Sequence, residues 1–281
     1  MARIRVVTDS ASDLPEDVAS RLDIDVVSLT IRFGDEEFTD RVDLTPEVFW
    51  AKCKTSKTLP ETSAPSVGAF QAAFERAADD GCDGVLVVTL SSLLSATYQS
   101  ASLAADAVSE RIAVRVIDTE NVSMGQGLIA IDLAELAATG ATLEELSARA
   151  TALLPKSGVL GTIDTLEHLI KGGRIGGAKA LIGQVLSIKP LVELKGGVVA
   201  EAGRQRTRAK ALAAVARATA THAPLRRLAL VHGACSDADV ATLRGLANEI
   251  ASEFPLIVTD IGPVVGTHAG PGIIALTFVE S

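Results

Sequence analysis

The chain has little of what several common classes of protein require. Aromatic residues make up only 3% of its 281 residues, and the formal net charge is -9. Nucleic-acid-binding proteins use rings for base stacking and basic side chains for phosphates, so this composition argues against a nucleic-acid partner. The three cysteines, Cys53, Cys82 and Cys235, are widely spaced and form neither a disulfide framework nor a C-x-x-C pair, which suits a reducing compartment.

Signals for membranes, metals and nucleotides are also missing. No uncharged apolar run approaches the ~20 residues of a membrane span, and the N-terminus lacks the apolar core of a signal peptide, so we expect a soluble cytoplasmic protein. The four histidines show no paired metal-ligand spacing, and we expect no metal site. Residues 172–180 are rich in glycine but lack the G-K-[ST] of a phosphate loop, so we expect no nucleotide or other cofactor.

In the first half, short runs of Val, Ile and Leu alternate with helical segments. Such runs are typical of strands covered on both faces, and they lie at residues 4–8, 26–31, 85–90 and 112–118. Helices are predicted at residues 14–21, 46–54, 66–79, 97–108 and 124–138. This alternation predicts an α/β fold with a doubly wound parallel sheet as an N-terminal domain over residues 1–155.

After a helix predicted at residues 143–154, the pattern changes. A strand at 159–163 is followed by a glycine-rich turn at 172–177 and by a hairpin around Gly196 and Gly197. Helices at 207–221 and 237–252 and two closing strands complete the chain. Residues 156–281 are therefore predicted to form a smaller C-terminal α+β domain.

Three turns far apart in the sequence gather hydroxyls, glycines and one histidine, at residues 62–66, 91–97 and 266–272. The first is predicted to start a helix capped by Ser63 or Ser66, and a helix N-terminus also favours an anion. The second follows an apolar strand, at the carboxyl end where open α/β sheets bind ligands. The third surrounds His268 with glycines that permit a close backbone approach. These groups are suited to hold an anionic head group.

Three functions stay open on the residues alone: a binding protein, an acyl hydrolase using Ser95 and His268, and a binding protein for a small phosphorylated metabolite. The hydrolase requires an acid to orient the histidine and an oxyanion hole, and no spacing identifies either. Ser95 also lacks the G-x-S-x-G context of a nucleophile elbow. The basic segment 204–210 is either a solvated helix face or a docking patch for an acidic partner or phosphate.

These segments, in this order, resemble the DegV family of bacterial fatty-acid-binding proteins. The resemblance begins at Val7-Thr8-Asp9-Ser10 and includes all three turns, Lys171-Gly172-Gly173-Arg174-Ile175 and Lys189-Pro190. Each motif is weak by itself, but the ordered series over 281 residues is specific. The chain departs from the family at Ala96, where glycine is common, and at Ala64, where glutamine is frequent.

The resemblance implies two α/β domains with a long-chain fatty acid bound between them. It also implies similarity to the carrier subunits of bacterial fatty acid kinases, in which a separate ATP-dependent kinase phosphorylates the bound acid for phospholipid synthesis. The chain would then be a lipid-binding carrier and not an enzyme. Carried over by motif, the residues around the carboxylate are Thr62, Ser63, Ser95, Gly266 and His268. We expect four arginines to dock the kinase, namely Arg174, Arg204, Arg206 and Arg208.

Overall fold

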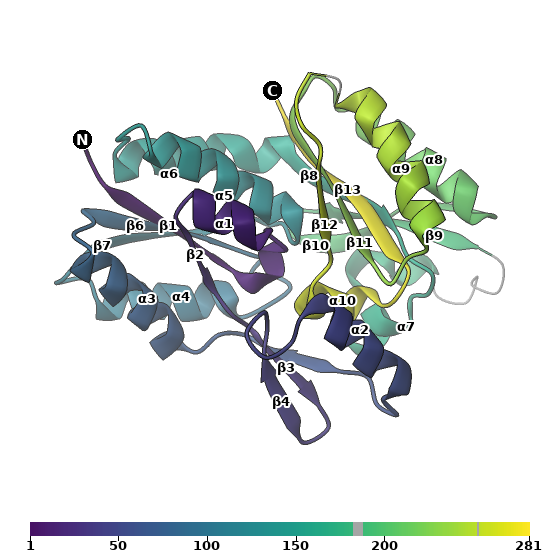
Figure 1. The fold of residues 1–281 in the computed structure, drawn as a ribbon, viewed down its shortest axis with the longest axis horizontal. Helices are drawn as coiled ribbons and strands as arrows, with labels where there is room; N and C mark the ends of the chain where they lie inside the picture. Colours follow the sequence, from purple (N-terminus) through teal and green to yellow (C-terminus); the bar gives the residue numbers. More distant parts are fainter. Residues whose placement is uncertain (182–187, 252) are drawn as a thin grey trace.

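A computed structural model describes residues 1–181, 188–251 and 253–281 of the chain. Two sheets lie next to each other, each with its own helices, and a small third sheet lies beneath their junction (Figure 1). The predicted α/β class with an N-terminal doubly wound parallel sheet and a second α+β part is confirmed.

The N-terminal sheet has four parallel strands in the order β2-β1-β6-β7. The strands are β1 (Ile4–Asp9), β2 (Ile24–Val27), β6 (Gly84–Thr89) and β7 (Ala113–Asp118). Helices pack on both faces, and every residue of β6 is buried, which explains its unbroken aliphatic sequence. The helices of this half are α1 (Glu16–Arg21), α3 (Val67–Asp79), α4 (Thr97–Ala107), α5 (Met124–Ala137) and α6 (Leu143–Leu153).

Helix α5 lies between the two large sheets. It contacts β1 and β6 on one side and β8, β11 and β13 on the other. All of its residues from Met124 to Ala134 are buried, and all of them are apolar except Gln126 and Asp132. A single apolar cluster therefore continues from Val6 in β1 to Ala275 in β13.

The second large sheet has six strands in the order β10-β9-β8-β13-β11-β12. They are β8 (Ser157–Thr162), β9 (Lys189–Lys195), β10 (Val198–Gln205), β11 (Leu225–Gly233), β12 (Ile257–Asp260) and β13 (Ile273–Glu280). All pairs are antiparallel except β11 with β12. Helices α8 (Arg208–Ala220) and α9 (Asp237–Ile250) cover its outer face, and the end predicted for α9, Ser252, lies outside the described residues.

The third sheet, in the order β4-β3-β5, was not predicted. It consists of β3 (Thr30–Phe33), β4 (Glu36–Thr39) and β5 (Glu61–Ser63), with α2 (Pro46–Thr55) beside it. The single strand predicted at 26–31 is in fact β2 and β3, because Leu29 between them donates its N–H to the Ser10 hydroxyl at 3.0 Å. Residues 62 and 63 belong to β5 and do not start a helix; Ser66 caps α3 by accepting from the N–H of Ala69.

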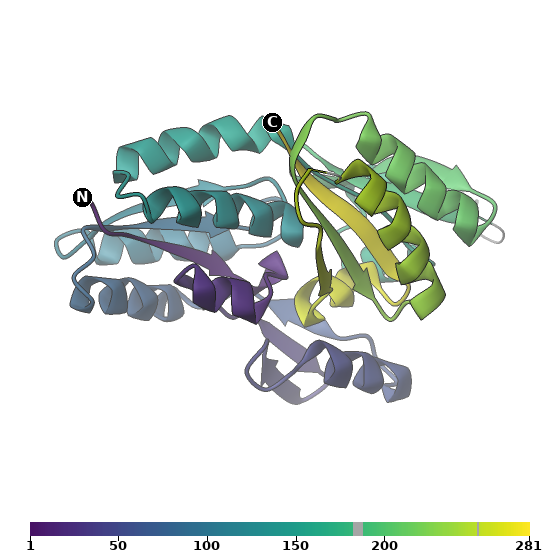
Figure 2. The ribbon, with the colours of Figure 1, turned by 45° about the horizontal axis from the view of Figure 1, so that its top comes forward.

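The turn predicted at 266–272 is also different in the structure, since most of it belongs to helix α10 (Pro263–Ala269). Pro263 occupies the first turn, where a proline favours helix initiation. This helix contacts α2, β3 and β5, and Figure 2 shows it directly above them. The segment 30–63 thus packs against the C-terminal half, although it belongs by sequence to the predicted domain 1–155. A 3₁₀ turn (Leu154–Lys156) joins the two halves at the predicted boundary.

The buried carboxyl group of Asp40 leads to a testable prediction about how stability depends on pH. Burial raises the pKa of Asp40 from 3.8 to about 6. Because the folded chain then binds this proton more tightly than the unfolded chain, the stabilising contribution is complete below pH 3.8 and is lost as the pH rises through about 6. At pH 7.5 Asp40→Asn should therefore be more stable than wild type by about 3 kcal/mol. At pH 4 the substitution should bring no such gain. Chemical denaturation at both pH values tests this, and a difference that does not change with pH would contradict it.

Candidate functional site

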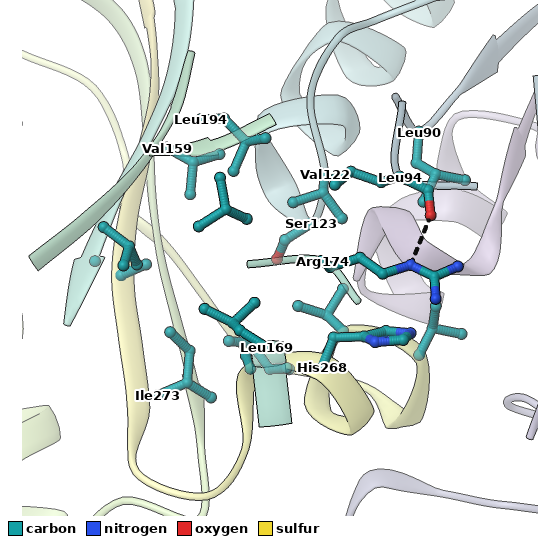
Figure 3. Close-up of a pocket in the computed structure, with 18 of the residues that line it drawn as sticks. Leu90, Leu94, Val122, Ser123, Val159, Leu169, Arg174, Leu194, His268 and Ile273 are labelled. Atoms are coloured by element: carbon teal, nitrogen blue, oxygen red, sulfur yellow. Dashed lines mark hydrogen bonds between the residues drawn. The ribbon is translucent and has the colours of Figure 1, made fainter. Parts of the chain in front are cut away.

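A largely apolar cavity lies between the two halves, next to the carboxyl ends of β6 and β7 and to the inner face of the six-stranded sheet (Figure 3). Its empty volume is about 880 Å³ when the solvent at its open side is included. The aliphatic residues that line it are Leu29, Leu90, Leu94, Val122, Val159, Ile163, Leu169, Val192, Leu194, Val199, Val231, Ile261, Val264, Val265, Ala269, Ile273 and Ala275.

Polar groups gather at one end of the cavity. Thr62 Oγ1 lies 2.8 Å from His268 Nε2, and Arg174 lies beside the imidazole. Ser95 lines the same cavity, and its hydroxyl pairs with that of Thr97 at 2.9 Å. Val159, Leu194 and Ile273 lie on the side away from Leu94 and Arg174 (Figure 3). The cavity thus has one end where polar groups gather and one mainly aliphatic end, where Glu193 of β9 is also a lining residue.

Four separate segments bring these polar groups together. Thr62 lies in β5, Ser95 follows β6 just before α4, Arg174 lies in the glycine-rich turn at 172–177, and His268 lies near the end of α10. The backbone carbonyl of Ser91 closes the second turn, because it accepts hydrogen bonds from the N–H groups of Leu94 and Ser95 at 3.0 and 3.2 Å. The β9–β10 turn closes against this segment, because the Ser91 hydroxyl donates to the carbonyl of Gly197 at 2.7 Å. A site of this kind requires both halves of the chain.

Burial, together with the nearby charge of Arg174, lowers the pKa of His268 to about 4. The ring is therefore neutral near pH 7, and only one of its nitrogens bears a proton. Its Nδ1 is buried and has no hydrogen-bond partner among the described residues. When Nε2–H donates to Thr62, the Thr62 hydroxyl keeps its own proton to donate to an anionic ligand.

Arg174 supplies the positive charge at this end. Its Nε donates to the carbonyl of Leu94 at 3.0 Å, and its Nη1 donates to that of Gly172 at 2.7 Å. The sequence analysis expected a head-group site of hydroxyls, amides and an imidazole, and assigned Arg174 to kinase docking. The structure places this side chain in the cavity wall and also in an outer pocket, because the glycine-rich turn after α7 (Glu167–Lys171) folds back over the loop after β6. Its predicted part in docking the kinase stays a prediction.

The remaining predicted residues differ in their positions. Ser63 is exposed on the face of β5 opposite Thr62, as the alternation of a strand requires. Gly266 does not line the cavity; a Cβ atom there would lie 2.7 Å from the ring of Phe49, so its role is close packing with α2. Arg208 is largely buried and bonds Asp239 and the carbonyl of Gly272 at 3.1 and 2.7 Å.

The basic residues Arg204 and Arg206 are exposed at and after the end of β10. They do not line the cavity. Of the four arginines predicted to dock a partner, Arg204 and Arg206 lie away from the cavity, whereas Arg174 lines both the cavity and an outer pocket.

Ser123 is a cavity residue that the sequence analysis missed. It lies immediately before α5, is 2% exposed, and points toward the middle of the cavity (Figure 3). The sequence contained a signal for this residue. Asn121-Val122-Ser123 follows β7 at the carboxyl edge of the parallel sheet, and the position at that edge was the reason for assigning the turn after β6 to a ligand site.

The geometry gives no support to the hydrolase alternative. The Ser95 hydroxyl bonds Thr97, and the His268 ring bonds Thr62, so no serine–histidine pair is seen in the described part of the chain. The same residues hold no group of three or more His, Cys, Asp or Glu side chains placed to bind a metal ion. None of the helices described is both long and apolar enough to cross a bilayer.

A cavity with a long aliphatic wall and one polar end defines a binding site for an amphipathic ligand. A family model described as "Uncharacterised protein, DegV family" matches residues 3–281. The chain belongs to the DegV family.

Its relatives are similar over nearly their whole length. A DegV domain-containing protein of Deinococcus radiodurans is 35% identical over 281 residues, which cover 97% of each chain. A DegV family protein from Thermus thermophilus that binds fatty acid is 35% identical, with a TM-score of 0.90 and 99% of each chain covered. A stearic acid-binding protein from Eubacterium ventriosum is 25% identical, with a TM-score of 0.90 over 99% of this chain and 98% of that one.

Proposed function

We propose that this chain binds one long-chain fatty acid in the cavity and presents its carboxylate to a separate ATP-dependent kinase, which phosphorylates it to an acyl phosphate for phospholipid synthesis. The observation that supports this most strongly is the division of the cavity into an aliphatic wall and a single polar end. The bound fatty acids of the related proteins support the same ligand class.

The energetics suit such a ligand. Each buried CH₂ group contributes about 0.8 kcal/mol, so a long acyl chain supplies most of the affinity. A carboxylate left unpaired in the same interior would be costly. The hydroxyls of Thr62 and Ser95 donate to it, and Arg174 compensates its charge.

The polar end is also accessible from outside. Thr62, Arg174 and His268 line a second, outer pocket together with Lys171 and the segment 59–61. A phosphoryl group added to the carboxylate would lie there, between Arg174 and Lys171. The chain has no phosphate loop of its own, which fits a carrier whose nucleotide is bound by its partner.

Displacement of a fluorescent fatty acid tests the binding proposal. Palmitate should displace the probe, whereas methyl palmitate, which has the same tail without the charge, should bind at least tenfold more weakly because it accepts weaker hydrogen bonds. Equal affinity for the two would show that the polar end does not hold the carboxylate, and failure of both to bind would refute the proposal.

For the kinase, we propose a docking surface formed by Arg204 and Arg206. Both side chains are exposed and lie outside the cavity wall, so a partner reaches them without disturbing the lipid. Arg208 is excluded because its contacts with Asp239 and Gly272 are internal. Basic side chains at an interface rim accelerate encounter with an acidic partner, and salt weakens that effect.

Reversing both charges (Arg204→Glu with Arg206→Glu) should leave palmitate affinity unchanged and suppress kinase-dependent acyl phosphate formation by about tenfold or more. The measurement pairs lipid displacement with acyl phosphate formation at two salt concentrations. A matched control reverses Arg244, an exposed arginine on α9. Normal phosphorylation by the double variant would show that Arg204 and Arg206 belong to a solvated surface and do not dock the kinase.

A further inference from the structure

Asp13 joins three segments that are far apart in the sequence. It is fully buried, and its carboxylate accepts hydrogen bonds from the Ser123 hydroxyl and from the backbone N–H of Gly262, the latter at 2.9 Å. Its backbone carbonyl accepts from the Thr259 hydroxyl at 3.3 Å. One residue of the N-terminal half therefore holds the beginning of α5 and the beginning of α10.

Helix α10 transmits this contact to the polar end of the cavity. Gly262 immediately precedes the helix, and His268 lies near its other end. Because α10 is only seven residues long, a displacement of its first turn also moves the imidazole away from Thr62 Oγ1, now 2.8 Å distant. The anchoring contact is close: a Cβ atom on residue 262 would lie 3.0 Å from Asp13 Oδ1.

The same carboxylate stabilises an unusual backbone at the cavity wall. Ser123 has φ 56° and ψ -148°, a conformation that costs a non-glycine residue on the order of 1–3 kcal/mol. Its hydroxyl donates to Asp13 and its N–H donates to the carbonyl of Ala11 at 2.8 Å, while its own carbonyl accepts from Gln126 and Gly127 in the first turn of α5. The side chain of Ser123 lines the cavity, whereas Asp13 does not.

We infer that Asp13 is a positioning residue of the head-group site: through Gly262 it fixes α10, and with it His268, at the distance that the contact with Thr62 requires. Through Ser123 it fixes the beginning of α5 at the cavity wall. Asp13 acts without touching the ligand. This inference rests on the proposed function, since it gives Asp13 a part in holding the fatty-acid carboxylate.

The test uses the full chain and two readouts, the NMR titration of the His268 ring without ligand and the affinity for palmitate. The His268 signal is assigned by its loss in His268→Gln. In Asp13→Ala we expect the pKa of His268 to rise from about 4 toward its ordinary value as α10 shifts and the ring gains water. Palmitate affinity should fall by about tenfold or more.

In Asp13→Asn the side-chain amide still accepts a hydrogen bond from the N–H of Gly262 and donates one to the Ser123 hydroxyl, so palmitate affinity should stay within about threefold of wild type.

Asp132→Ala is the matched control. Asp132 is also a buried carboxylate that joins the two halves, through Arg149 in α6 and Arg226 in β11, but neither it nor its partners line the cavity. This variant should lose thermal stability and keep both the His268 titration and the palmitate affinity of wild type. A general loss of stability therefore cannot produce the result expected for Asp13→Ala.

Gly262→Ala keeps the experiment decisive if Asp13→Ala does not fold. The residue has φ -72°, which alanine adopts without strain, so the substitution perturbs only the contact with Asp13. It should shift the His268 titration in the same direction by a smaller amount. The inference is overturned if Asp13→Ala folds and keeps the His268 titration and the palmitate affinity of wild type. If Asp13→Ala does not fold, the same result for Gly262→Ala overturns it. Wild-type protein that refuses palmitate overturns the proposed function instead, while the ligand-free titration still decides the role of Asp13.

Discussion

Thr62→Ala and Ser95→Ala should each weaken the binding of palmitate by about tenfold or more. Each substitution removes a hydroxyl that donates to a charged acceptor in a cavity with few other polar groups, a loss of about 1.5–3 kcal/mol. Thr62→Ala also removes the partner of His268 Nε2 and leaves the imidazole without a described hydrogen bond. Isothermal titration of lipid-free protein with palmitate measures both effects.

Neighbouring serines provide matched controls. Ser63 follows Thr62 but is exposed on the opposite face of β5, and Ser92 is exposed three residues before Ser95. Ser63→Ala and Ser92→Ala should bind palmitate like wild type. If all four variants bind alike, the carboxylate lies elsewhere in the protein.

Filling the aliphatic end should shorten the preferred acyl chain. Ala275 lines the cavity from β13, the strand that also carries Ile273, and Ile273 lies on the side away from Arg174. In Ala275→Leu the added side chain occupies the space of about three methylene groups, so palmitate should lose about 2.4 kcal/mol, or roughly fiftyfold in affinity.

Decanoate is the internal control for this variant, because a shorter tail does not reach the filled end. Its affinity should remain near that of wild type while that of palmitate falls, which a general unfolding of the cavity would not produce. The measurement is a series of displacement titrations from ten to eighteen carbons. A uniform loss across the series would show that Ala275 does not face the end of the acyl chain.

The large sheets could be predicted from the sequence because their signals are local. The aliphatic run of β6 and the capping serine of α3 depend on neighbours a few residues away. The small sheet depends instead on pairing between distant segments, such as Ile31 with Thr62, and its strands are short and partly polar. A sequence pattern contains no comparable signal for that pairing.

The candidate site was predictable to a similar extent. Thr62, Ser95 and His268 belong to motifs of small polar residues, and the structure brings them to one cavity. Arg174 was assigned to the surface because its place in the wall depends on a fold-back onto Leu94, 80 residues earlier in the chain. The anchoring role of Asp13 depends likewise on contacts with Ser123 and Gly262 that no spacing in the sequence reveals.

Native mass spectrometry of protein purified without added lipid tests the central claim most directly. The cavity has an aliphatic wall and one end where polar groups gather, so the spectrum should show one long-chain fatty acid per chain, confirmed by analysis of the organic extract. The mass of the adduct should disappear after delipidation and return on incubation with palmitate or oleate. A protein that is isolated empty and then binds neither acid would contradict the account.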